Sequence, residues 1–211
     1  AKNILRKAYS DFAYFQAEGA TGEFVESQDP TLSNEFSYDQ NVTAGYLSYT
    51  LQFLKNYTLK PGLRYEYTTI KADFKTEFEA EIPSYGTLVP SLNASRKLKN
   101  GNMIKAAYNR RIQRPSLRFL NPNIEASNPQ QLSQGNPTLD PELTDNYELG
   151  YSTFIKGTTL NFTGFYRNTT GSIQAIRDVR TDGIIFTSFE NIGREQALGT
   201  NLFFNVNINN K

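Results

Sequence analysis

The chain has 211 residues, and its 22 basic and 21 acidic side chains leave a formal net charge of +1. It contains no cysteine and no histidine, which excludes disulfides, thiolate metal sites and imidazole general bases. The even charge balance, without a basic stripe, gives no support for nucleic-acid binding. No apolar run approaches the ~20 residues that a membrane helix needs.

The mean hydropathy of −0.55 is that of a soluble protein, with one exception. A membrane β-barrel exposes only every second residue to lipid and carries long polar loops, so its mean hydropathy is also low. The first residues, AKNILRKAYSDF, lack the apolar centre of a signal peptide. A membrane or secreted protein would therefore be represented here by a mature chain or an excerpt.

Alternation of apolar and polar side chains with period two dominates the chain and predicts strands. In residues 57–67, Tyr57 and Leu63 fall on one face, and Lys60 and Arg64 fall on the other. Several such segments match the ~10 residues of a tilted membrane-crossing strand. The fold class is therefore all-β, and we expect an antiparallel up-and-down meander of about nine strands, near residues 9–17, 36–54, 57–70, 87–98, 103–114, 144–155, 158–180, 184–190 and 196–209.

The predicted connections fall into two length classes. Short turns are expected at 55–56, 99–102, 156–158 and 191–195, and long polar links near 17–35, 71–86 and 113–143. In an up-and-down order every short turn lies at one rim and every long link at the other, apart from a short link at 181–183. An outer-membrane barrel sorts its connections in this way.

Three positions within the predicted strands carry breaking residues. Pro61 and Pro90 fall inside apolar phases, where a closed sheet has no free edge for a residue without an N–H, so we expect bulges or strand ends there. The predicted strand 158–180 contains Thr170-Gly171, where it could break. Tyrosines near the strand ends suit an aromatic girdle at the lipid headgroups, namely Tyr46, Tyr57, Tyr67, Tyr108, Tyr147 and Tyr166.

An ordered series of short motifs resembles a known family. RRIQRPSLRFLNPN (110–123), QGNPTLDPEL (134–143) and DNYELGYS (145–152), followed by FENIG (189–193), resemble TonB-dependent outer-membrane receptors. The likeness is greatest to the outer-membrane β-barrel family of Bacteroidetes-type bacteria. It implies a barrel of about 22 strands around an N-terminal plug. Since about nine strands cannot close such a barrel, residues 1–211 are interpreted as one segment of a single barrel domain.

The resemblance implies the function and the partners. We expect part of a receptor in the cell outer membrane that binds and imports a small-molecule or oligomeric nutrient without being an enzyme, and without a cofactor. Its partners would be outer-membrane lipid and a TonB-type energy-coupling system, reached through a plug domain that this sequence does not contain. A lipoprotein that covers the loops is a further candidate, and no nucleic acid is expected.

The polar phase of the strands carries too many charges for a buried globular face. Its candidates for ligand contact, in the lumen or at the rim, are Arg64, Glu66, Arg111 and Glu148. In a barrel these side chains line a wet interior or face a plug. In the alternative, a soluble antiparallel β-sandwich or barrel that binds carbohydrate or protein, they lie on the solvent face. Strand length and loop sorting favour the lumen.

Two further features have competing interpretations. The Pro-rich loop 114–143 either touches a ligand or partner lipoprotein, or is a stiff cover that connects strands. The acidic residues Asp140, Glu142, Asp145 and Glu148 could form a calcium site or a glycosidase pair. Because nothing fixes a second carboxylate group opposite them, we interpret them as solvated charges beside a rim and expect no metal site. A β-rich hydrolase is the third hypothesis. Arg110, on the apolar phase, is expected near a rim.

Overall fold

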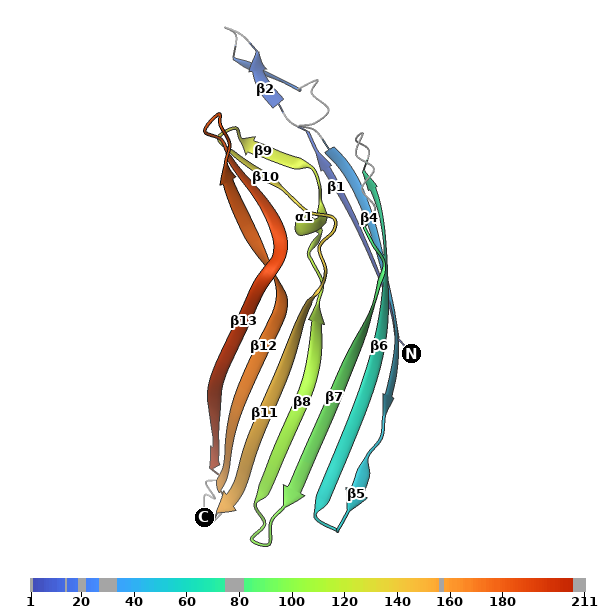
Figure 1. Ribbon diagram of the computed structural model, residues 1–211, viewed down its shortest axis with the longest axis vertical. Coiled ribbons are helices and arrows are strands. Elements are labelled where there is room, and N and C mark those ends of the chain that lie inside the picture. Colours follow the sequence, from blue (N-terminus) through green and yellow to red (C-terminus); the bar gives the residue numbers. More distant parts are fainter. Residues whose placement is uncertain are drawn as a thin grey trace, which may run out of the picture.

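The computed structural model describes residues 2–13, 15–18, 22–26, 34–74, 82–155 and 158–206 of the chain. Most of these residues lie in strands, as the alternation of their side chains predicts (Figure 1). The described part contains a short helix, α1 (Leu117–Leu120), and no helix in it is long and apolar enough to span a membrane.

Eight long strands form an antiparallel meander in which each strand pairs with the next (Figure 1). The predicted fold class and the up-and-down order are confirmed. Its strands are β1 (Lys2–Phe12), β4 (Asn34–Ser48), β6 (Tyr57–Phe74), β7 (Tyr85–Lys97), β8 (Met103–Gln113), β11 (Glu142–Ile155), β12 (Thr158–Val179) and β13 (Ile185–Val206). The short strands β2 (Phe15–Glu18) and β3 (Glu23–Glu26) pair with each other, and β5 (Leu51–Phe53) pairs with β6.

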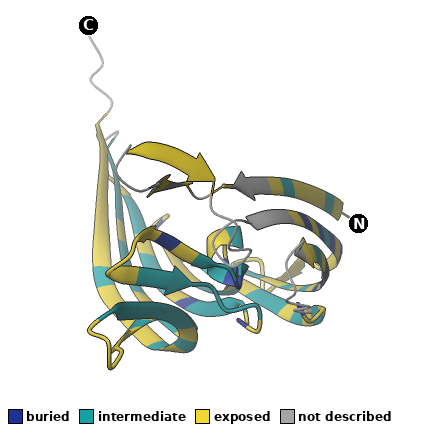
Figure 2. Ribbon diagram, turned by 90° about the horizontal axis from the view of Figure 1, so that it is seen from above, coloured by how far each residue is buried: buried dark blue, intermediate teal, exposed yellow. Residues whose placement is uncertain are grey.

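The registers hold the two predicted phases on opposite faces of the sheet. In β6, Leu63 and Tyr65 are each 49% exposed, whereas Glu66 and Thr68 are buried at 3% and 0%. Figure 2 shows the sheet curving, with α1 on its concave side. The apolar phase faces outward, where described residues form no second layer over it. A soluble sandwich would bury such a face against another sheet, so this arrangement favours a barrel wall.

The described connections between the long strands lie at two rims, as the up-and-down order predicts, apart from the turn expected at 191–195. At the turn rim are the turn between β5 and β6 and the hairpin between β7 and β8, whereas the predicted turn at 156–158 falls largely outside the described residues. In that hairpin Gly101 takes a positive φ of 82°, and the Leu98 N–H donates to the carbonyl of Asn102 over 2.8 Å. The long connection between β8 and β11 begins and ends at the opposite end, the loop rim, where the short turn between β12 and β13 also lies as the expected exception. The predicted long links at 17–35 and 71–86 lie partly outside the described residues.

Three strand predictions need correction. The first strand runs over Lys2–Phe12 rather than 9–17, because its register with β4 fixes it where its own alternation is weak. The predicted strand 36–54 divides into β4 and β5. The predicted turn at 191–195 is wrong, since β13 continues through it. Gly193 lies close to Ser172 of β12, where an added Cβ would meet the Ser172 Cβ at 2.8 Å, so this glycine allows close approach rather than a turn.

Strand β12 is continuous through Thr170-Gly171, so the break that was considered there is absent. Instead the register with β13 shifts locally on either side of Ser172, and Gly171 has a φ of 66°. A local shift of this kind, as in a β-bulge, interrupts the regular pairing without ending the strand.

The expected bulges or strand ends at Pro61 and Pro90 are also wrong, because β6 and β7 pair without a shift from Tyr57 to Thr68. Each proline lacks a backbone N–H, and on the side of the strand opposite the β6–β7 pairing the neighbouring strand leaves an interruption at that position. The Tyr49 N–H donates to the Pro61 carbonyl over 3.2 Å, which turns the Pro61 nitrogen toward the break between β4 and β5. Pro90 lies one residue beyond Ser91, where the pairing of β7 with β8 ends.

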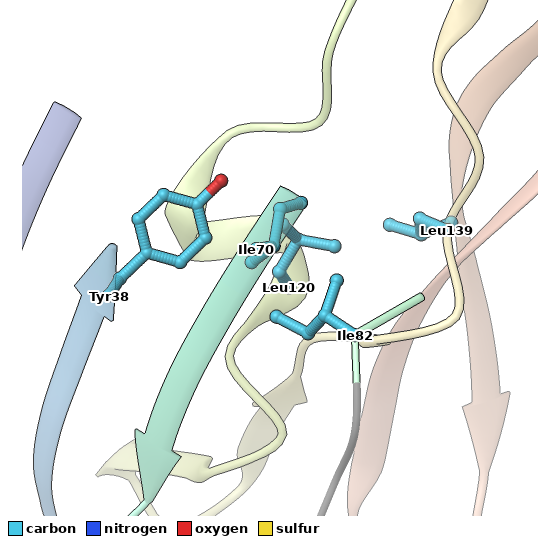
Figure 3. Close-up of a cluster of buried hydrophobic side chains, with 5 residues drawn as sticks. All are labelled: Tyr38, Ile70, Ile82, Leu120 and Leu139. Carbon is cyan, nitrogen blue, oxygen red and sulfur yellow. The ribbon is translucent and has the colours of Figure 1, made fainter. Parts of the chain in front are cut away.

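A cluster of buried apolar side chains lies on the concave side of the sheet (Figure 3). Its members come from β4, β6 and the links that precede β7 and β11, and they are Tyr38, Ile70, Ile82, Leu120 and Leu139. Ile173 of β12 and Phe189 of β13, which are only partly buried, pack against this cluster. The cluster therefore joins the two flanks of the meander through the segment between β8 and β11.

We predict that the two faces respond differently to charge. Leu202 points outward from the lower half of β13 and is 61% exposed, whereas its neighbour Asn201 points inward. Leu202→Arg should destabilise the full-length barrel in phospholipid vesicles by about 2–4 kcal/mol, the cost of arginine at the bilayer midplane. Asn201→Arg should change stability little. Urea unfolding measures both, and equal losses would contradict the assigned faces.

Candidate functional site

The segment between β8 and β11, residues 114–141, crosses the concave side of the sheet (Figures 1 and 2). This crossing segment contains α1, β9 (Ile124–Asn128) and β10 (Gln131–Gln134). Strand β10 pairs in parallel with β13, with Gln131 opposite Ile185 and Ser133 opposite Thr187. A loop that might have projected from the rim is thus held against the wall, as the stiff-cover interpretation requires.

Close backbone contacts explain the sequence GNP at the centre of the segment. Gly135 donates its N–H to the Asn121 carbonyl over 2.8 Å, and a Cβ on Gly135 would lie 2.3 Å from that oxygen. Only glycine fits there without backbone movement. The Asn136 side chain then donates to the Phe189 carbonyl over 3.0 Å.

The same segment is tied to β13 through Asn191. Its Oδ1 accepts from the Asp140 N–H over 2.8 Å, and its Nδ2 donates to the carbonyls of Asp140 and Gly171 over 2.9 and 2.8 Å. The motifs QGNPTLDPEL and FENIG therefore meet in space. Their amide side chains satisfy backbone groups of an irregular segment that has few ladder partners of its own.

Two of the four predicted site residues, Arg64 and Glu66, form an ionic cluster on β6 in which the Glu66 carboxylate is buried and the Arg64 side chain is partly exposed. The Glu66 carboxylate pairs with Arg64 over 2.7 Å and also with Arg114, the first residue of the crossing segment. Arg114 Nε donates to Thr68 Oγ1 over 3.1 Å. With two guanidinium groups on one carboxylate, the buried charge is compensated. This cluster anchors the crossing segment and leaves Glu66 without open access.

The third predicted residue, Arg111, faces a polar hollow on the inner wall beneath the crossing segment. This upper hollow, of about 450 Å³, is bordered by β8, β11, β12 and β13, with Arg167, Thr144, Thr169 and Glu195 among its lining residues. In the described part of the chain neither Arg111 nor Arg167 has a carboxylate within ion-pair distance. The Arg111 guanidinium and the terminal N–H groups of Arg167, whose Nε donates to Asn146, can thus bind a ligand with acceptor oxygens.

The fourth predicted residue, Glu148, is linked to the upper hollow by hydrogen bonds. Arg167 Nε donates to Asn146 Oδ1 over 3.2 Å, and Asn146 Nδ2 donates to Glu148 Oε1 over 2.6 Å. Asn146 is only 2% exposed, so its amide is fixed between the two charges. Glu148 also borders a lower hollow of about 580 Å³ that contains Lys60 and Lys105.

The structure thus places all four predicted residues on the inner face and divides them into two groups. Arg64 and Glu66 are joined by Arg114, which the sequence analysis did not single out, because no local pattern shows that a loop residue reaches β6. Arg111 and Glu148 are accompanied by Arg167, which was also missed. Arg167 has the same parity on β12 as Thr163 and Phe165, and this alternation could have placed Arg167 on the inner face.

The acidic residues near the start of β11 do not form one site. Asp145 points outward, where it accepts hydrogen bonds from Arg110 over 2.9 and 3.0 Å and from Tyr108 over 2.8 Å. Glu148 points inward, and the Glu142 carboxylate accepts from the Ile173 N–H over 2.8 Å. Residues at odd and even positions of one strand lie on opposite faces. No group of three or more potential metal ligands occurs among the described residues.

Comparison with known proteins gives one family and several related folds. The model of the family described as "Outer membrane protein beta-barrel family" matches residues 1–211. No curated protein matches the chain in sequence.

Among solved structures, the Serratia marcescens hemophore receptor HasR aligns with a TM-score of 0.63 at 14% identity, over 97% of this chain and 39% of HasR. The ferric enterobactin receptor PfeA of Pseudomonas aeruginosa aligns with a TM-score of 0.60 at 16% identity, over 94% of this chain and 32% of PfeA. The copper transporter OprC gives 0.59 at 13% identity, over 98% and 32%. The chain thus spans well under half the length of these proteins, and the likeness concerns the fold.

We predict that Arg114 holds the crossing segment on the wall. Arg114→Met leaves Glu66 with Arg64 alone and should weaken the attachment by about 1–3 kcal/mol, the usual cost of losing a partner of a buried charged group. Chymotrypsin cleavage near Phe119 in the folded, full-length protein should then become about tenfold faster. The control is Arg118→Met on the same segment, whose 3.5 Å pair with Glu125 is exposed and weak. Equal cleavage of both variants would contradict the anchoring role.

Proposed function

Because the chain belongs to the outer membrane protein β-barrel family, we propose that it forms part of the wall of a TonB-dependent receptor that binds and imports a nutrient. The observation that carries the proposal is the two-faced meander. Its apolar phase faces outward, and its charged phase faces an interior that the crossing segment covers at the loop rim. A wall of this kind suits a passage for hydrophilic compounds through the outer membrane.

Several features support a larger receptor. The eight long strands form an open sheet, and a barrel wide enough to enclose a plug needs more of them. The chain aligns with less than half of HasR, PfeA and OprC, which are named as receptors and a transporter. A plug domain, its TonB contact and a lipoprotein partner would belong to the rest of the assembly.

The inner wall supports binding without covalent chemistry. Arg111 and Arg167 present to the upper hollow two guanidinium groups that have no carboxylate partner among the described residues, beside hydroxyl groups of Thr144 and Thr169. Arginine forks bind carboxylate, phosphate and similar oxygen groups in a bidentate manner. We assign Arg111 and Arg167 to ligand contact, Glu148 to the orientation of Arg167 through Asn146, and Arg64 and Glu66 to the anchor of the crossing segment.

The proposed function is tested by growth. The gene is deleted in its own host, which is grown on media that each limit one nutrient: iron, a vitamin, an oligosaccharide or a peptide. We expect a defect on one medium, restored by the full-length protein only in cells with a working TonB system. Restoration in cells without TonB, or normal growth of the deletion strain on every medium, would count against import through this barrel.

The assignment of the upper hollow is tested once the nutrient is known from that screen. Arg111→Gln and Arg167→Gln should each weaken its binding to the purified receptor about tenfold, since a hydrogen bond to a charged group contributes about 1.5–3 kcal/mol. Arg180→Gln, in the exposed turn before β13, is the control and should bind normally. Titration calorimetry gives the affinities, and unchanged binding in both hollow variants would remove these residues from the ligand path.

A further inference from the structure

The upper hollow contains a row of four polar residues on four adjacent strands. Arg111 of β8 lies opposite Thr144 of β11. Thr144 in turn lies opposite Thr169 of β12, and Thr169 lies opposite Glu195 of β13. All four residues line the hollow. The row therefore begins with a cation, continues with two hydroxyl groups and ends with a carboxylate.

Glu195 forms the negative end of the row and is held from behind. Its Oε1 accepts a hydrogen bond from Ser172 Oγ over 2.9 Å, and the buried Ser172 Oγ also accepts from Gln174 Nε2 over 3.1 Å. Within the described ranges of the chain, the other carboxylate oxygen of Glu195 has neither a hydrogen-bond donor nor a cation. Since Glu195 lines the hollow, this oxygen can accept from a ligand there.

Two guanidinium groups form the positive end. Arg167 lies one register row nearer the turn rim than Arg111, and its Nε donates to Asn146 Oδ1 over 3.2 Å. The guanidinium carbon of Arg167 also lies 4.6 Å from the ring centroid of Phe165, so cation–π attraction helps to hold it. The terminal N–H groups of Arg167 and the guanidinium of Arg111 remain for a ligand with acceptor oxygens.

The wall thus keeps opposite charges near each other without pairing them. Arg167 and Glu195 are diagonal neighbours on adjacent strands, a relation that separates residues by about 7–8 Å and lies within reach of long side chains. No ion pair joins these two residues in the described structure. Asn146 and Phe165 hold the guanidinium, and Ser172 holds the carboxylate. A ligand that carries both a carboxylate and an ammonium group would satisfy both charges at once.

We propose that the upper hollow binds a short peptide by its two charged ends. The C-terminal carboxylate is bound by Arg111 and Arg167, and the N-terminal ammonium group is bound by Glu195. The proposal rests on the proposed function, for which it names the class of nutrient. Arginine suits the carboxylate because its planar fork matches two carboxylate oxygens.

The dimensions of the hollow agree with a peptide of two to four residues. Arg111 and Glu195 are three strand spacings apart, about 14 Å between their backbones. An extended peptide of two to four residues is at most about 7–14 Å long. Between its ends the peptide groups meet the hydroxyls of Thr144 and Thr169. These hydroxyls are hydrogen-bonded to each other over 2.9 Å, so one hydroxyl hydrogen and several lone pairs of the two remain for the peptide.

The test measures the affinity of the purified full-length receptor for trialanine by titration calorimetry. Two modified forms each lack one charge: N-acetyl-trialanine has no ammonium group, and trialanine amide has no carboxylate. We expect the wild type to bind trialanine about tenfold more tightly than either form, because each form loses a charge-assisted hydrogen bond. Free alanine, which has both charges but no peptide group, should bind more weakly as well.

Variants assign each end of the peptide to its residue. Glu195→Gln, which keeps an oxygen for Ser172 Oγ, should bind trialanine and its acetylated form equally while it still discriminates against the amide. Arg111→Gln should lose preference only against the amide. Glu190→Gln is the matched control and should behave as the wild type, since Glu190 lies on the same strand between the inward residues Phe189 and Asn191 and so points outward. Heat-modifiable mobility on gels shows that each variant is folded.

The proposal is wrong if trialanine does not bind, if either blocked form or free alanine binds as tightly, or if Glu195→Gln keeps the preference of the wild type. The comparison of ligands on the wild type decides the matter even where a variant does not fold. The proposed function fails separately, through normal growth of the deletion strain on every medium. A TonB-dependent growth defect on another nutrient, together with no binding of trialanine, overturns the peptide assignment alone.

Discussion

Every backbone amide and carbonyl of a membrane-crossing strand must find a partner within the protein, because hydrocarbon offers none. In this chain the antiparallel ladders provide those partners, and the geometry of a strand then places successive side chains on opposite faces. The outward phase meets lipid and the inward phase meets water, so one period-two pattern sets both surfaces. The site residues and the crossing segment both depend on this division.

The crossing segment connects the two flanks of the sheet and organises the interior. The crossing segment rests on an apolar cluster that includes Tyr38 and Ile70 on one flank, while Phe189 of the other flank packs against it. Its first residue, Arg114, pairs with the buried carboxylate of Glu66. A segment that is fixed at both flanks can limit access to the hollows beneath it, although its helix and strands are short. Its many prolines and the close approach at Gly135 suit a cover of defined shape.

The sequence determines this architecture to different extents at different places. The existence of the strands and the faces of their side chains followed from alternation, because a half-apolar strand has a strong local signal, and the rims followed from the lengths of the connections. Continuity was harder to predict, since Asn191 to Gly193 reads as a turn until its pairing with β12 is known. The inward placement of Arg111 and Glu148 could be predicted from the alternation of side chains along their strands alone. The contact of Arg114 with Glu66, by contrast, depends on the path of a long loop, which no periodicity encodes.

The claim on which the account depends is that odd-numbered residues of β11 face lipid and even-numbered ones face the interior. The chain has no native cysteine, so single cysteines can be placed from Tyr147 to Ser152 in the full-length receptor without other changes. Spin labels on these cysteines, in a bilayer, report their access to oxygen and to a polar nickel chelate. The account predicts that access to oxygen peaks at positions 147, 149 and 151 and is low at the positions between them. Oxygen access without a period of two, or with its maxima at the even positions, would contradict it.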